Sequence, residues 1–368
     1  MQLLTEEQTM VRDMAAGFLE EKAPVSALRA LRDEGAALGY DKALMGEMAG
    51  MGWFGMLVGE EAGGVDMGAM AAGLVAEEMG RRLTASPFLS SGVLSAAALC
   101  AAGEGDWAAK IASGEAVVAF AADEHGKHEA GPITTRAEAS GNGFVLSGAK
   151  RFVSDAVGAD RVIVPAMTEE GLGLFLVDPS QDGVTTRAFA TVDSRNAADL
   201  TFDGVQLDGA ARIASGEGAE AAMASALRTG RAVAAAELCG VAKEASERTV
   251  AYLKERKQFG ITIASFQALQ HRAADLYTRI QTTEAAVAAA LTAIDEGSDE
   301  AETLSRVAKA KANKTASLAV REAVQMHGGI GMTDALDIGL FMKKARASIE
   351  YLGDSACHAD WLLREAGI

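Results

Sequence analysis

The spacing of apolar residues changes twice along this chain, and that change constrains its fold more than any other feature. Apolar side chains recur at helical spacing from Leu3 to about Ser113. Between about Glu115 and Ile213 the period falls to two, in short runs bounded by Gly, Asp, Asn and Pro, which predicts strands. Helical spacing returns after Gly218. We therefore expect an α+β multidomain fold with a helical domain over 1–114, a β domain over 115–213 and a helical bundle over 214–368.

The helical spacing and the period of two each predict particular elements. Thr5 and Gln8 have the spacing of a capping box, which predicts the start of the first helix. Strands are expected at Val117–Ala121, Phe144–Val153, Val162–Met167, Leu172–Val177 and Leu200–Leu207. Because no helices separate them, these strands indicate a compact β sandwich or barrel. The last part of the chain predicts four long helices, of which the first, over 219–259, would be about 60 Å long at ~1.5 Å per residue.

Charge and cysteine usage exclude several classes of function. The chain has 34 basic and 51 acidic side chains, a net charge of −17, which argues against a broad grip on nucleic acid. It has no run of ~18 apolar residues, and its first residues are acidic where a secretory signal is basic, so we expect a cytoplasmic protein without membrane insertion. Cys100, Cys239 and Cys357 are far apart and form no C-x-x-C pair, which indicates reduced core thiols and no zinc site.

Several familiar chemical motifs fail in this sequence. Gly50–Gly55 fits G-x-G-x-x-G, but it follows a helical segment instead of a strand and therefore does not predict a dinucleotide-binding fold. A Walker loop and a G-x-S-x-G elbow are absent. His125 and His128 lie three residues apart in a polar stretch, which predicts a solvated loop and no metal site.

Two glycine-containing segments in the helical C-terminal part carry the first functional signal. Lys254–Gly260 runs into Ile261–Gln267, and about sixty-five residues later Gln325–Gly331 reads Q-M-H-G-G-I-G. Basic residues in a last turn and a following Gly260 also suit a simple helix end. Together, however, the segments resemble the acyl-CoA dehydrogenase family, in which R-x-x-F-G…F-Q closes one bundle helix and Q-x-x-G-G-x-G ends another.

Three further segments extend the resemblance over the whole chain. Gly148–Ser154 is similar to the family's G-x-K-x-[W/F]-I-[T/S] strand, Leu200–Val205 to the strand that leaves its β domain, and Gly52–Gly55 to a glycine-aromatic turn. The resemblance implies the helical, β, helical order with a C-terminal four-helix bundle. It also implies an FAD-dependent oxidoreductase acting on CH–CH donors, which removes the α-proton of an acyl-CoA thioester while the β-hydrogen passes as hydride to flavin N5.

The resemblance also implies which residues bind FAD. Arg256 offers a planar fork of donors suited to the diphosphate, and Gly328 and Gly329 let backbone N–H groups approach phosphate. Phe152 and Ser154 match positions beside the flavin ring, where Ser154 would hydrogen-bond near N5. The other candidates serve ribose and adenine edges or pack against adenosine: Gln258, Phe259, Ile263, Gln267 and Gln325. In the family this half of FAD lies across a subunit boundary, so a dimer or tetramer is implied.

Neither position at which the family carries its catalytic base has a carboxylate here. The family's Y-E-G-T run reads Y-L-G-D, so Leu352 stands where the glutamate is expected. A minority of the family places the glutamate just before the arginine matched by Arg231, and that place holds Gly230. Asp354 and Glu237 are the candidate bases that remain. Each also has a structural interpretation, because Asp354 suits a helix N-cap and Glu237 suits an ion pair.

These departures leave three functions open. The first is an acyl-CoA dehydrogenase of lipid or acyl-thioester catabolism, which takes an acyl-CoA substrate and passes electrons to an electron-transfer flavoprotein. The second, motivated by Leu352, is a non-catalytic or half-site subunit that completes the FAD site of a related protein in a heteromer. The third is an oxygen-using flavin enzyme on the same fold. The family's T-E-P…G-S-D loop is also replaced, by Ala122–Gly126, which puts its flavin or thioester contacts in doubt.

Overall fold

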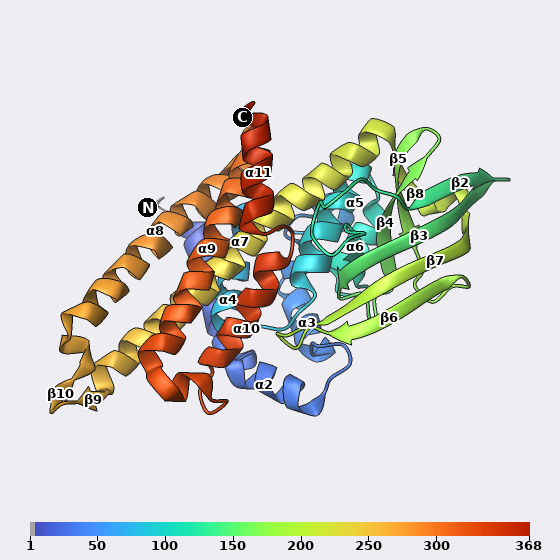
Figure 1. The fold of residues 1–368 in the computed structure, drawn as a ribbon. Coiled ribbons are helices and arrows are strands. Elements are labelled where there is room, and N and C mark those ends of the chain that lie inside the picture. The colour runs from blue at the N-terminus through green and yellow to red at the C-terminus, as the bar shows by residue number, and fades with distance from the viewer. Residues whose placement is uncertain (1–3) are drawn as a thin grey trace. The chain divides into compact units, whose positions relative to one another are not determined.

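The computed structural model describes residues 4–368, and these form two compact units (Figure 1). The first unit consists of the chain up to Arg29, of Gly73–Thr84 and of Arg231–Ile368. The second consists of Ala30–Ala72 and Ala85–Gly230. Each unit therefore combines segments that are far apart in the sequence.

The first unit is a bundle of helices in which α9 packs against α8, α10 and α11 (Figure 1). Thr5 and Gln8 form the expected capping box before α1. The helices are α1 (Glu6–Lys22), α8 (Gln267–Asp295), α9 (Ala301–His327), α10 (Ile338–Glu350) and α11 (Ser355–Glu365), together with most of α4 (Gly68–Arg82) and the C-terminal part of α7 (Gly216–Glu255). A hairpin of β9 (Lys257–Gln258) and β10 (Ile261–Thr262) joins α7 to α8 through the short helix η5 (Ile263–Ser265).

Helices α4 and α7 cross at two glycines. A Cβ atom on Gly80 would overlap the carbonyl oxygen of Glu237, and one on Gly240 would overlap the carbonyl oxygen of Glu77. The backbones therefore approach more closely than any larger residue allows at these two positions. This crossing fixes the part of α7 that carries Glu237.

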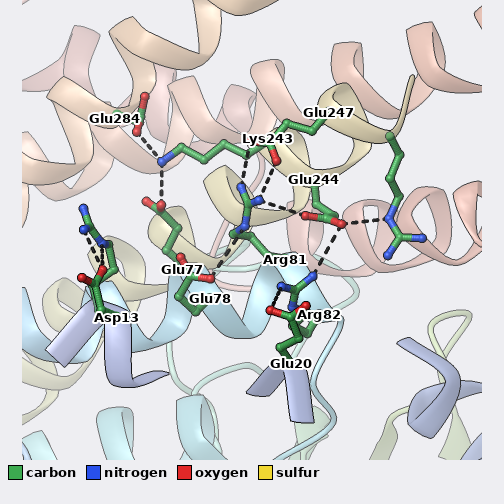
Figure 2. A network of polar contacts seen from close by, with 12 residues as sticks. Asp13, Glu20, Glu77, Glu78, Arg81, Arg82, Lys243, Glu244, Glu247 and Glu284 are labelled. Carbon is green, nitrogen blue, oxygen red and sulfur yellow. Dashed lines mark hydrogen bonds and ion pairs between the residues drawn. The ribbon is translucent and has the colours of Figure 1, made fainter. Parts of the chain in front are cut away.

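Ion pairs surround the crossing, and Figure 2 shows them as one network. Arg81 on α4 bridges two glutamates of α7, with Nη2 2.6 Å from Glu247 Oε2 and 3.1 Å from Glu244 Oε2. Lys243 on α7 pairs with Glu77 of α4 at 2.5 Å and with Glu284 of α8. Glu247 is largely exposed, but Arg81, Glu244, Lys243 and Glu77 are mostly withdrawn from water, so removing a partner of one of these four would leave a poorly solvated charge behind.

The second unit is built on an eight-stranded sheet (Figure 1). Its strands run in the order β6-β7-β3-β2-β4-β5-β8, and β1 pairs in parallel with β4. The strands are β1 (Val118–Phe120), β2 (Arg136–Ser140), β3 (Gly143–Ser154), β4 (Arg161–Thr168), β5 (Gly171–Val177), β6 (Val184–Ala190), β7 (Asn196–Asp208) and β8 (Arg212–Ser215). The helices of the unit include the second half of α2 (Val25–Glu34), α3 (Lys42–Gly50), α5 (Ala96–Ala102), α6 (Gly105–Ala112), a π-helix, η3 (Phe88–Ser95), and the N-terminal part of α7.

The five expected strands form, and the fold has the helical, β, helical order. Strands β2, β6 and β8 lie outside the five stretches named from the sequence, and β2 and β6 bury almost none of their side chains and so lack an apolar alternation. The helical end also differs from expectation. Helix α7 stops at Glu255 instead of Phe259, and Gly260, with φ +81°, lies in the β9–β10 turn instead of ending a helix. Three long helices are followed by two shorter ones, α10 and α11, where four long helices were expected.

Two further properties concern the exterior of the chain. Over residues 4–368, no helix combines the length and the apolar character needed to cross a bilayer. Cys239 is buried, as expected of a core thiol, whereas Cys100 is exposed and Cys357 is partly exposed, so the core assignment was wrong for Cys100.

Candidate functional site

Strand β3 ends on an irregular stretch that carries Phe152 and Ser154. The pairing of β3 with β7 shifts register between Lys150 and Val153, and Phe152 has a left-handed φ of +51°. Its ring remains 54% exposed and meets Phe189 of β6 edge to face at 5.6 Å. The hydroxyl of Ser154 has no hydrogen-bond partner within the described part of the chain. An exposed aromatic ring and a free hydroxyl on one strand end fit a bound planar ligand.

A buried carboxylate holds Phe152 in this conformation. Asp199 on β7 accepts a hydrogen bond from the Phe152 N–H at 3.2 Å. It also pairs with Arg151 at 2.7 Å and with Arg187 at 2.6 Å. Burial raises the pKa of Asp199, but these hydrogen bonds outweigh burial and lower it below its usual value. The carboxylate therefore stays charged at neutral pH.

An open cavity of about 560 Å³ lies beside Phe152. Its lining is Glu124, His125, Gly126, Arg151, Phe152, Arg187, Phe189 and Asp199. Residues from the replaced loop thus lie at the cavity together with the end of β3. Sequence reasoning missed the two arginines, because nothing in the spacing of Arg151 and Arg187 brings them to one carboxylate.

Glu124 organises the loop that departs from the family pattern. Its carboxylate accepts hydrogen bonds from Lys150 Nζ at 2.8 Å, from Thr134 N at 2.6 Å and from Thr135 N at 3.1 Å. Burial would raise the pKa of Glu124, but the bonds from Lys150, Thr134 and Thr135 lower it to about 2. Burial lowers the pKa of Lys150 in spite of its partner. We expect both groups to be charged at neutral pH, because the carboxylate collects several donors.

The histidines of this loop differ from expectation. His128 is buried, with only 2% of its side chain exposed, and its Nδ1 lies 2.9 Å from Asp123 Oδ1. The expectation of a wholly solvated loop is therefore wrong for His128, because the neighbouring Asp123 gives the buried ring a polar partner. His125 lines the cavity. Among the described residues, no three His, Cys, Asp or Glu side chains are grouped in a way that would hold a metal ion.

The hairpin after α7 presents the first group of predicted cofactor ligands. Arg256, Gln258 and Phe259 are exposed, and Phe259, at the turn, is 90% exposed with φ +54°. The guanidinium of Arg256 forms no ion pair with any described residue. Its backbone is fixed, because Arg256 N donates to Tyr252 O and Ile263 N donates to Arg256 O, both at 2.8 Å. Gln267 is the exposed first residue of α8.

The end of α9 presents the second group. Gln325 is exposed on the last turn, and Gly328 follows with φ +67°. Cβ atoms built on Gly328 and Gly329 would meet nothing within 4 Å, so the backbone is open on this side. Tyr252 of α7 stacks on His327 of α9 with ring centroids 4.4 Å apart. This contact brings the ends of the two helices together.

These residues fit a diphosphate. An exposed and unpaired guanidinium is free to donate to two phosphate oxygens, and an open glycine backbone lets N–H groups come close to the same anion. The two predicted segments, about sixty-five residues apart in the sequence, lie at ends of helices that one aromatic contact joins. The structure therefore brings Arg256 and the Gly328–Gly329 turn into one unit with their polar groups available.

The base position holds a buried leucine in a left-handed turn. Leu352 is 2% exposed and has φ +58°, and Gly353 follows with φ +103°. Asp354 is the N-cap of α11, where its Oδ1 accepts from Ala356 N and Cys357 N at 2.9 Å. The structural interpretation of Asp354 is therefore present in the molecule, and the carboxylate has two backbone donors.

Glu237 and Arg231, on α7, are both engaged in ion pairs. Glu237 is 7% exposed, and its Oε1 lies 2.9 Å from Lys344 Nζ of α10. Arg231 pairs with Glu302 of α9 at 2.7 Å. The ion-pair interpretation of Glu237 is thus also present in the molecule.

A buried lysine that sequence reasoning missed holds the turn. Lys309 of α9 is fully buried, and its Nζ donates to Asn313 Oδ1 at 2.7 Å, to Ser348 O at 3.0 Å and to Gly353 O at 3.2 Å. Asn313 Nδ2 donates to the same Gly353 oxygen at 3.1 Å. Complete burial lowers the pKa of Lys309 to about 7. The one available signal was its place four residues before Asn313, with Ala308, Ala312 and Ala316 around it on the helix.

Comparison with known proteins identifies the fold. Models of the N-terminal, middle and C-terminal domains of acyl-CoA dehydrogenases match residues 5–115, 118–205 and 216–367. Acyl-CoA dehydrogenase FadE27 of Mycobacterium tuberculosis is 31% identical over 281 residues, which cover 73% of this chain and 73% of that protein. Acyl-CoA dehydrogenase IpdE2 of Mycolicibacterium smegmatis is 29% identical over 351 residues, which cover 95% of this chain and 96% of that protein.

A solved structure agrees as well. A variant of the Tcur3481-Tcur3483 steroid ACAD superimposes with a TM-score of 0.88 and 29% identity, over 99% of each chain. The three domain models together span nearly the whole sequence, and the glycine, arginine and glutamine segments predicted to carry the cofactor lie in the C-terminal one. The chain therefore belongs to the acyl-CoA dehydrogenase family, whose members are oxidoreductases acting on CH–CH donors.

Proposed function

We propose that the protein is an FAD-dependent oxidoreductase that introduces an α,β double bond into an acyl-CoA thioester. The observation that carries this proposal is the exposed, unpaired Arg256 together with the open Gly328–Gly329 backbone, at helix ends that Tyr252 and His327 join. When bound, FAD would supply the hydride acceptor, its N5. An electron-transfer flavoprotein is the proposed electron acceptor.

Each proposed ligand has a separate task at the cofactor. Arg256 would bind the diphosphate oxygens, and the N–H groups at Gly328 and Gly329 would complete their coordination. Ser154 would donate to the flavin ring, beside which Phe152 excludes water. The amides of Gln258, Gln267 and Gln325 would bind ribose and adenine edges, while Phe259 and Ile263 pack on adenosine.

Removal of the α-proton needs a catalytic base, and this chain has no carboxylate at either position where the family carries one. Asp354 and Glu237 are the proposed bases, in that order. Asp354 would have to accept a proton while it caps α11, and Glu237 while it pairs with Lys344. Loss of a general base costs ~10²–10⁴ in rate, so a chain in which neither serves would be nearly inert.

A second candidate function follows from the base position. Leu352 is buried and cannot accept a proton, which favours a half-site subunit that completes the FAD site of a base-bearing relative. The name of the similar steroid ACAD joins two designations, which is consistent with such a pairing. The exposed hairpin around Phe259 would then be covered by the related subunit.

Anaerobic titration of the purified protein with a panel of acyl-CoA thioesters tests both functions. Bleaching of the flavin absorbance supports the dehydrogenase, and no bleaching with any straight, branched or steroid-derived thioester counts against it. A half-site subunit should lose flavin when purified alone and regain it when co-expressed with a base-bearing relative. A stable, flavin-saturated and active homo-oligomer would rule out the half-site function.

A further inference from the structure

The turn at the base position is strained, and its own sequence does not explain the strain. Leu352 has φ +58°, a left-handed conformation that glycine and asparagine adopt readily but that branched apolar residues avoid. A leucine side chain makes no hydrogen bond that would favour this conformation. Such a residue persists only when its surroundings determine the backbone.

The surroundings here are polar and buried. Lys309 and Asn313 both donate to the carbonyl oxygen of Gly353, directly after Leu352. Two residues after Gly353, Ser355 Oγ donates to Ala310 O of α9 at 3.1 Å. Gly353 and Ser355, the residues on either side of Asp354, are thus both hydrogen-bonded to α9.

Lys309 also caps the C-terminal end of α10, immediately before the turn. Its Nζ lies 3.0 Å from Ser348 O and 3.4 Å from Ile349 O, which are among the last carbonyls of α10. A cation is favourable at a helix C-terminus, and an ammonium has three protons for the acceptors that surround it. Glu350, Asp354 and Glu237 add negative charge nearby, and Arg231 adds positive charge. A buried cation is costly without such partners, so its presence indicates a specific task.

We propose that Lys309 and Asn313 are positioning residues, which hold the Tyr351–Asp354 turn in the geometry that a proton-accepting side chain at position 352 needs. At the position where the family carries its glutamate, only the carboxylate is then missing, and Leu352→Glu alone would supply a base there, in addition to whatever Asp354 or Glu237 provides. This inference rests on the proposed dehydrogenase function. The introduced carboxylate would take the α-proton of the thioester, the electrons of that C–H bond would form the C=C bond, and the β-hydrogen would leave as hydride to oxidised flavin.

Four variants test the proposal in the intact oligomer, with a co-expressed partner chain where flavin binding needs one. They are Leu352→Glu, its isosteric control Leu352→Gln, and each of these combined with Lys309→Met. Three quantities are measured: flavin content, the anaerobic rate of flavin reduction by acyl-CoA thioesters, and amide hydrogen exchange over residues 351–354. Exchange needs neither flavin nor substrate, so it reports the turn independently of activity.

Leu352→Glu should reduce flavin on the order of 10²-fold or more faster than Leu352→Gln. Adding Lys309→Met should remove most of this gain and speed exchange over 351–354, with flavin content unchanged. If Lys309→Met prevents folding, Asn313→Asp replaces it, because it keeps an acceptor for Lys309 but loses the donor to Gly353. Unchanged exchange, or a full gain without Lys309, overturns the proposal. So does a flavin-loaded Leu352→Glu with no gain.

Failure of the proposed function has a different signature. If no variant holds flavin with any partner chain, the dehydrogenase assignment fails. The exchange measurement then still decides whether Lys309 and Asn313 hold the turn.

Discussion

At the scale of single residues, the Asp354 carboxylate has two roles: it is a proposed catalytic base and it caps the start of α11. Its Oδ1 accepts from two backbone N–H groups at the start of α11. Asparagine caps helices about as well as aspartate, but it cannot take a proton. We therefore predict that Asp354→Asn keeps the free energy of unfolding within a few tenths of a kcal/mol, while Asp354→Ala lowers it by about 1 kcal/mol.

Denaturant unfolding of the two Asp354 variants checks this prediction, and flavin reduction measured on the same samples separates the roles. A rate loss in Asp354→Asn without a stability loss would identify Asp354 as the base. An equal stability loss in both variants would contradict the cap.

Glu124 predicts a pH dependence of stability. Its folded pKa of about 2 lies below its ordinary value of 4.5, so the contribution to stability is complete above pH 4.5 and is lost as pH falls towards 2. Glu124→Gln should remove this acid-induced loss. It should also cost about 3–5 kcal/mol at neutral pH, because Lys150 is left buried without its partner.

Unfolding followed between pH 7 and pH 2 checks the Glu124 prediction. The matched control is Glu124→Gln with Lys150→Met, which removes both charges and should recover part of the loss at neutral pH. An acid transition that Glu124→Gln leaves unchanged would show that another carboxylate is responsible.

At the scale of elements, the crossing of α4 and α7 depends on two glycines without side chains. Gly240→Ala would place a methyl group against the Glu77 carbonyl, and Gly80→Ala one against the Glu237 carbonyl. We predict that each lowers the free energy of unfolding by about 1–3 kcal/mol or more. Gly17→Ala, at an exposed position of α1 with open space around it, should instead gain up to about 1 kcal/mol.

Thermal or denaturant unfolding of the three alanine variants checks the crossing. If Gly240→Ala were as stable as Gly17→Ala, the close approach of the two backbones would be wrong. Because Glu237 lies at this crossing, a shift of the helices would also alter its pair with Lys344.

Strands were predictable from the sequence where side chains are buried in a run or in alternation. Strands β4 and β5 are buried along most of their length, and β7 is buried over its first five residues and then alternates between buried and more exposed side chains. The exposed strand β6 has no such alternation. The end of α7 was misplaced because Lys257 and Gln258 suit a last helical turn as well as the two-residue strand they form. Only the pairing with Ile261 and Thr262 decides between them.

At the scale of the whole molecule, the sequence identified the family through short polar and glycine-containing segments. Arg256 and Gly328 stay predicted diphosphate ligands, chosen because a diphosphate site needs particular residue types in a particular order. The hydrogen bond of Lys309 to Gly353 and the ion pairs of Asp199 with Arg151 and Arg187 were not predictable, since each joins residues whose only relation is spatial. Whether each candidate base is hydrogen-bonded or ion-paired likewise depends on its partners in space, which are the α11 backbone for Asp354 and Lys344 for Glu237.

The flavin content of the purified protein shows whether this chain binds FAD through Arg256. Arg256→Ala should leave the protein with little visible flavin absorbance, because the diphosphate loses its two-pronged donor. Arg256→Lys should recover part of the flavin, and Lys254→Ala, which removes an exposed lysine on the last turn of α7, should lose none. A native protein that is colourless with every partner chain would show that the chain does not bind FAD, and an Arg256→Ala protein with full flavin content would show that Arg256 does not hold it.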